Sequence, residues 1–147
     1  MKLSEAILLG STMSPQRFGP ACKGDPPEDK RRCVIEAAVE AIGEPAHVSN
    51  DRRWFGVDVT NYRALWKAWP WCATHKPQYS CPHAVCGLPS PVWPLLFHLN
   101  DVHHWTRPEI AAWVATIEPQ DAPLLEHQPP SETHDTSPEC AHAGVAQ

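Results

Sequence analysis

Apolar residues recur at helical spacing in several short stretches of the chain, and turn or capping residues bound most of them. The first stretch predicts a helix over residues 4–10, with Ser4 as its cap and Gly10 in the position of a left-handed terminating residue. The next predicts a helix over residues 26–42 with Asp25 as its N-cap. Its small apolar residues share one face, which we expect to lie in the core.

The second half of the chain carries further helical patterns. Residues 60–69 place two Trp, a Tyr and a Leu on one helical face, and such stripes usually pack in a core. Residues 95–104 can form a helix behind a proline-rich turn. A helix over residues 106–118 is predicted by the capping box that begins at Thr106 and by the proline that follows. Residues 54–59 fit either a strand or an extended loop.

Together these elements predict a mainly α protein, with four or five short helices around a Trp-rich core. Seven Trp among the 147 residues help to build that core, and the 17 Pro favour short elements joined by loops. We expect one small helical domain over residues 1–118. Residues 119–147 contain five Pro, five acidic residues and no Lys or Arg. This composition predicts a disordered acidic tail, because such a chain buries too little apolar surface to offset its ordering entropy.

Four residues in the middle of the chain have the spacing of metal ligands. Cys81, Cys86, His98 and His103 form the pattern C-x4-C-x11-H-x4-H. Zinc prefers four thiolate or imidazole ligands in a tetrahedron, and a tight cysteine turn followed by a helix supplies them with little chain. Gly87 suits the turn that the second cysteine requires. We therefore predict a structural zinc site with these four ligands.

Other histidines and cysteines leave alternatives open. His104 competes with its neighbour for the fourth ligand position. Cys72 and His75, spaced C-x2-H, could join the cysteine pair to form a different set of ligands. Cys22 and Cys33 have no convincing partner in the sequence, so we expect them to pack or to remain free thiols.

Residues 79–104 resemble the two-cysteine, two-histidine zinc finger. Tyr79 lies two positions before the first cysteine and Leu95 lies three before the first histidine, as in that family. The central spacer departs from the finger pattern by one residue. The resemblance implies a small zinc module inside the helical domain. The run 98–106 is also similar to a stretch found in short uncharacterised bacterial and phage proteins, which implies no activity and suggests only a phage or mobile-element source.

The charge of the chain argues against nucleic acid as a partner. The formal net charge is -5, and the triplet 30–32 is the longest basic run. Fingers that read DNA carry Arg, Lys, Asn or Gln on the helix, and none of these lies between Cys86 and His98. Nucleic-acid binding through the basic triplet and exposed Trp therefore stands as the third hypothesis.

We expect a small zinc-stabilised binding or adaptor protein that acts through protein contacts and is not an enzyme. No phosphate loop, nucleophile elbow or triad signature is present in the sequence. The second hypothesis is a metal-dependent hydrolase or nuclease that uses His98, Asp101, His103 and His104. A closed site with four protein ligands argues against it, because catalytic zinc keeps one position for water.

The sequence predicts a protein without a membrane span or a cleaved leader. Glu5 interrupts the short apolar start, and no apolar run approaches the roughly 18 residues that cross a bilayer. Six cysteines without a secretory signal are typical of reduced thiols and metal ligands. We therefore expect a cytoplasmic location.

Overall fold

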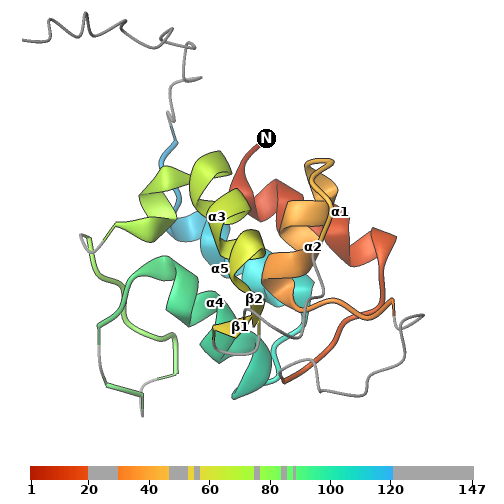
Figure 1. Cartoon of the computed structure of the whole chain (residues 1–147). Coiled ribbons are helices and arrows are strands. Elements are labelled where there is room, and N and C mark those ends of the chain that lie inside the picture. Colours follow the sequence, from red (N-terminus) through yellow and green to blue (C-terminus); the bar gives the residue numbers. More distant parts are fainter. Residues whose placement is uncertain are drawn as a thin grey trace, which may run out of the picture.

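The computed structural model shows a mainly α protein, as predicted (Figure 1). It describes residues 1–19, 30–46, 53–54, 57–74, 77–83, 86–87 and 89–120. The helices are α1 (Leu3–Met13), α2 (Val34–Ala41), α3 (Val59–Ala68), the 3-10 helix η1 (Pro70–Ala73), α4 (Val92–Asp101) and α5 (Arg107–Ile117). Two short strands, β1 (Arg53–Trp54) and β2 (Val57–Asp58), pair antiparallel. They lie in the segment whose sequence fitted either a strand or an extended loop.

Helix α1 is longer than predicted and does not end at Gly10. It begins after Lys2, whose backbone N–H donates to the carboxylate of Glu5 at 2.9 Å, and it continues to Met13. Gly10 is buried where α1 crosses α2, and a Cβ there would overlap the carbonyl oxygen of Ala37. The glycine therefore allows the two backbones to approach closely, and the prediction that it terminates the helix was wrong.

Helix α2 starts later than the sequence predicted. Residues 30–33 are not helical, and Cys33 is the N-cap. Its backbone N–H donates to the Glu36 carboxylate at 3.0 Å, and its sulfur accepts from the Glu36 N–H at 3.5 Å, which makes a capping box. The predicted cap, Asp25, lies outside the described residues. The same Glu36 carboxylate pairs with Arg17 at 2.7 Å, with both side chains buried, and so holds the segment after α1 against α2.

Helices α1 and α5 lie antiparallel, and charged residues at the ends of α5 satisfy the ends of α1. Arg107 is buried and donates to the backbone oxygens of Gly10 and Ser14 at the carboxyl end of α1. Glu118 accepts hydrogen bonds from the backbone and the hydroxyl of Ser4 at the amino end. A cation at the carboxyl end and an anion at the amino end both complement the helix dipole.

Helix α3 confirms the predicted aromatic stripe. Tyr62 and Leu65 are fully buried, and Trp66 is partly buried. The rings of Tyr62 and Trp66 both meet Trp93 of α4 edge to face, with centroids 5.3 and 6.0 Å away. Trp69, just beyond the helix, is also buried and donates to the backbone oxygen of Met1 at 3.1 Å. The stripe therefore packs α3 against α4 and the amino terminus.

Among the residues that the structure describes, one apolar core joins the α-helices. The fully buried apolar side chains are Leu3, Ala6, Ile7, Ile35, Ala37, Ala38, Val39, Tyr62, Leu65, Cys72, Leu96, Leu99, Ile110 and Val114. Within the part of the chain that the structure describes, no helix has the length and apolar character needed to cross a bilayer. Residues 121–147 lie outside that part, so the predicted disordered tail and the domain boundary near 118 remain predictions.

Candidate metal centre

The two cysteines of the predicted site lie on a loop that a short antiparallel contact closes at its base. Tyr79 and Ser90 exchange two backbone hydrogen bonds, of 2.9 and 3.0 Å. Inside the loop, the N–H of Cys86 donates to the carbonyl oxygen of His83 at 3.1 Å. Gly87 then adopts a φ of 60°, as its place behind the second cysteine predicted. The loop thus turns both thiols toward helix α4.

Helix α4 supplies the first histidine. It begins at Val92, directly after Pro91, and ends at Asp101, so it starts and stops earlier than the predicted range 95–104. Proline fits the start of a helix, since the first N–H groups have no partner within it. Leu95 and Leu99 are buried, and they orient the helix so that His98 is only partly buried and faces the thiols.

The second histidine lies beyond the end of α4, in the turn that leads to α5. The backbone N–H groups of Val102 and His103 both donate to the carbonyl oxygen of His98, at 3.0 and 3.3 Å. His104 then has a φ of 53°, a left-handed conformation that reverses the chain. Its ring is exposed and lies against Phe18, with centroids 5.2 Å apart. The turn therefore brings His103 to the cluster and leaves His104 outside it.

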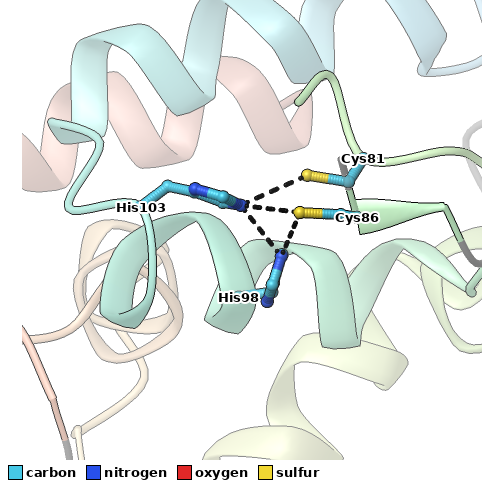
Figure 2. Close-up of side chains that lie close together, drawn as sticks. All are labelled: Cys81, Cys86, His98 and His103. Carbon is cyan, nitrogen blue, oxygen red and sulfur yellow. Dashed lines mark hydrogen bonds between the residues drawn. The ribbon is translucent and has the colours of Figure 1, made fainter. Parts of the chain in front are cut away.

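The four predicted ligand residues lie together (Figure 2). Their ligand atoms are all within 4.8 Å of one another. The Nε2 of His103 is 3.0 Å from the Nε2 of His98, 3.1 Å from the sulfur of Cys86 and 3.6 Å from that of Cys81. The Nε2 of His98 is 3.3 Å from the Cys86 sulfur. One imidazole nitrogen carries at most one proton, so hydrogen bonding alone does not account for three close neighbours around a single atom.

The size of the cluster fits a tetrahedral ion. Zinc–sulfur bonds of about 2.3 Å and zinc–nitrogen bonds of about 2.0 Å imply sulfur–nitrogen separations of about 3.5 Å and nitrogen–nitrogen separations of about 3.3 Å. The observed sulfur–nitrogen distances of 3.1, 3.3 and 3.6 Å and the nitrogen–nitrogen distance of 3.0 Å lie within a few tenths of an ångström of these values. The residues present could therefore hold a metal ion.

Neighbouring groups shift the protonation of the cluster toward neutral forms. Burial, followed by the charges of His83 and His98, lowers the pKa of His103. Burial, followed by the hydrogen bond and the charge of Cys81, raises the pKa of Cys86. His103 therefore offers a free lone pair at neutral pH, whereas Cys86 has to lose a proton to become a thiolate ligand. A bound cation favours that loss, so metal binding should release protons.

Two residues that sequence reasoning missed support the turn that carries His103. Gln16 donates from its side-chain amide to Asn100 at 2.9 Å and to the backbone oxygen of Trp105 at 2.8 Å, and it accepts from the backbone of Arg107 at 3.0 Å. His83, in the cysteine loop, stacks on the His103 ring. The position of His83 between the two cysteines is a local sequence signal that it lies near the site. Gln16 has no such signal, because its partners lie more than 80 residues away.

An apolar hollow of about 310 Å³ lies beside the cluster. An apolar lining lowers the polarity of the surroundings of a bound metal. The residues that line the hollow are Cys81, Cys86, Ser90, Trp93, Pro94, Leu95, Phe97 and His98.

Among the described residues, the other candidates do not lie in the cluster. The Asp101 carboxylate accepts instead from the backbone of Gly19 at 2.9 Å and from the Asn100 amide. Cys72 is buried in the core, and Cys33 caps α2, as described above. His75 and Cys22 lie outside the described residues.

One residue of the basic triplet, Arg32, is held in packing contacts. Arg32 lies 3.8 Å from the Glu40 carboxylate, and its backbone N–H and C=O bond to the segment after α1. Arg32 therefore has a role in packing that segment against α2.

Comparisons with known proteins add no family to this picture. A scan of protein-family models and searches of curated proteins and of solved structures return no match for this chain. The assignment of a function therefore depends on the geometry of the site.

Proposed function

We propose that this chain is a small, zinc-stabilised binding protein of the adaptor type, without catalytic activity. Cys81, Cys86, His98 and His103 would bind one zinc ion and hold residues 79–104 as a finger-like module inside the helical domain. The observation that carries this proposal is the convergence of the four ligand atoms to within 4.8 Å of one another.

The donor set favours zinc over other common ions. Two thiolates and two imidazoles are soft to borderline ligands, and calcium and magnesium prefer oxygen. A tetrahedral arrangement of two sulfurs and two nitrogens suits zinc, because structural zinc sites are almost always tetrahedral. The free thiols of the described cysteines fit a reducing compartment, which is the basis for proposing a cytoplasmic location.

The closed ligand set supports a structural role. Four protein ligands fill a tetrahedron and leave no position for the water that a hydrolytic zinc needs. The hydrolase or nuclease hypothesis requires Asp101 and His104 at the same centre, and both side chains have other contacts. In a structural role, the ion would instead fix the loop of the two cysteines to α4 and to the turn before α5.

Exposed apolar side chains on α1 support a role in protein contacts. Leu8 and Met13 are 51% and 52% exposed, and Leu9 between them is 41% exposed. Large apolar side chains on the exposed part of a helix surface are typical of interaction surfaces. The net charge of -5 and the packing role of Arg32 give little support to a nucleic-acid partner.

Metal analysis of the purified full-length protein tests the zinc site. We expect one zinc per chain, and a chelator should lower the thermal unfolding midpoint and the near-ultraviolet circular dichroism of the aromatic core. Cys86→Ser should lose the metal. Cys33→Ser is the matched control, because serine is a good N-cap and Cys33 lies outside the cluster. Wild-type protein without bound metal, or a Cys33→Ser variant that loses it, would contradict the proposal.

Capture experiments with surface variants test the adaptor role. We expect a specific co-purifying protein whose recovery falls in Leu8→Glu/Met13→Glu. Thr12→Glu, an exposed change on the same helix, should leave recovery unchanged. Equal recovery of the partner with wild type and with both variants would show that this surface of α1 does not bind it. Metal-dependent cleavage of a nucleic acid by the purified protein would favour the hydrolase hypothesis instead.

A further inference from the structure

The ring of His83 lies flat on the ring of His103. Their centroids are 3.9 Å apart and their planes differ by 7°. His83 comes from the loop between the two cysteines, whereas His103 comes from the turn after α4. The stack thus joins the two halves of the candidate metal centre.

A third ring fixes the orientation of His83. The indole N–H of Trp105 donates to the Nε2 of His83 at 3.0 Å, and the two ring centroids are 5.7 Å apart. An acceptor nitrogen carries no proton, so this bond requires His83 in the tautomer that is protonated on Nδ1. The bond also occupies the Nε2 lone pair, which a metal ion would need. His83 is accordingly absent from the group of four described residues that could hold a metal.

We propose that His83 and Trp105 are a positioning pair for His103, and that they set its affinity for the metal without binding the ion themselves. This inference rests on the proposed zinc site. His103 follows the end of α4, so no helix fixes its side chain. The flat contact with His83 limits rotation of the His103 ring and keeps its Nε2 directed at the Cys86 sulfur, 3.1 Å away. Residues outside the ligand set that orient the ligands in this way commonly change metal affinity 10–100-fold.

Cobalt titration of the full-length protein tests the proposal. Tetrahedral cobalt with two thiolates gives absorption bands that report both the ligand set and the affinity, and zinc competition then gives the zinc affinity. We expect His83→Ala to weaken both affinities at least about tenfold, with the position and intensity of the cobalt bands unchanged. His83→Phe keeps a flat ring and should recover part of the loss. Trp105→Phe removes the indole donor but keeps an aromatic ring, and its affinity should fall between those of wild type and His83→Ala.

A double variant separates a positioning pair from two independent packing residues. If Trp105 acts through His83, His83→Ala/Trp105→Phe should bind metal no more weakly than His83→Ala alone. Without metal, wild type and His83→Phe should unfold at nearly the same urea concentration. His83→Phe can therefore be used for the test if His83→Ala does not fold. Additive losses in the double variant would overturn the pairing.

Two other results would overturn the inference while leaving the zinc site in place. One is a His83→Ala affinity within twofold of wild type, and the other is a shift of the cobalt bands that shows His83 to be a ligand. Failure of the wild-type protein to bind cobalt or zinc at all is a different outcome, since it would remove the proposed function itself.

Discussion

His98 and His103 place their Nε2 atoms 3.0 Å apart, although helix α4 ends between them at Asp101. In an uninterrupted helix, residues five apart point in directions that differ by about 140°, so the two rings would face different sides. The end of the helix and the turn after it are therefore parts of the metal site. The left-handed residue His104 is the point at which that turn reverses the chain.

Substitutions at His104 should separate backbone conformation from metal ligation. Glycine adopts a φ of 53° without strain, so we expect His104→Gly to keep one zinc per chain and near wild-type stability. A β-branched residue is strained there, and His104→Val should lose about 1–3 kcal/mol of unfolding free energy and bind zinc more weakly. Urea unfolding and metal analysis measure both effects. Loss of zinc in His104→Gly would show that this histidine is a ligand after all.

Thiol reactivity should divide the cysteines into two classes. Burial raises the pKa of Cys72 to about 12, so at pH 8 roughly one molecule in ten thousand carries the reactive thiolate there. Burial, followed by the charge of Glu36, also raises the pKa of Cys33. In a Cys22→Ser/Cys140→Ser background we expect no fast-reacting thiol in the zinc-bound protein. A chelator should expose two thiols, and denaturant should expose four.

Peptide mapping after labelling identifies which thiols react. The chelator-dependent pair should be Cys81 and Cys86. Fast labelling of the zinc-bound protein at either position would indicate that no ion protects it. Labelling of Cys72 before denaturation would contradict its burial in the core.

The helices that the sequence predicted well are those whose signals are local. Helix α5 begins directly after its N-cap Thr106 with the predicted capping box, since the Thr106 hydroxyl and backbone donate to Glu109 three residues away. Helix α3 follows its aromatic stripe for the same reason. The start of α2 was predicted wrongly because the Cys33 cap depends on Glu36, and a buried ion pair with Arg17 holds that carboxylate in place. An ion pair between residues 19 positions apart produces no local pattern from which the sequence could predict it.

The candidate site shows the same division between local and distant causes. The ligand spacing was enough to select the four residues that the structure brings together. It could not show how His103 reaches the centre, because the supports of that turn come from elsewhere in the chain. Gln16 binds the backbone of Trp105 from a position 89 residues away. The choice between His103 and His104 was therefore open in the sequence and depends on the turn in the structure.

The capping box of α5 should respond to acid with a defined sign. The Thr106 hydroxyl, followed by its backbone N–H, donates to the Glu109 carboxylate and lowers its pKa below the ordinary value of 4.5. A carboxyl with a lower pKa in the folded state stabilises the fold above about pH 4.5, and this contribution is lost as the pH falls through the folded pKa. Thr106→Ala should therefore raise the Glu109 pKa toward 4.5.

Carboxyl carbon chemical shifts followed through a pH titration measure this pKa directly. Thr116→Ala is the matched control, because its hydroxyl bonds to Trp113 near the other end of α5. Any loss of zinc in acid affects both variants equally. The difference between their Glu109 pKa values therefore reports the effect of the Thr106 cap alone. Equal Glu109 pKa values in the two variants would show that the Thr106 hydroxyl does not bind the carboxylate in solution.

Replacing Gly10 with alanine should test the contact between α1 and α2. The added Cβ would overlap the Ala37 carbonyl oxygen, which belongs to the helix backbone and cannot rotate away. Forcing the helices apart should lower the unfolding free energy by about 1–3 kcal/mol, even though alanine is the better helix former. Thr12→Ala, on the exposed side of the same helix, should change it by no more than about 0.5 kcal/mol. Both variants should keep one zinc per chain, because neither residue is part of the cluster. A Gly10→Ala protein as stable as wild type would mean that the two helices do not pack this closely in solution.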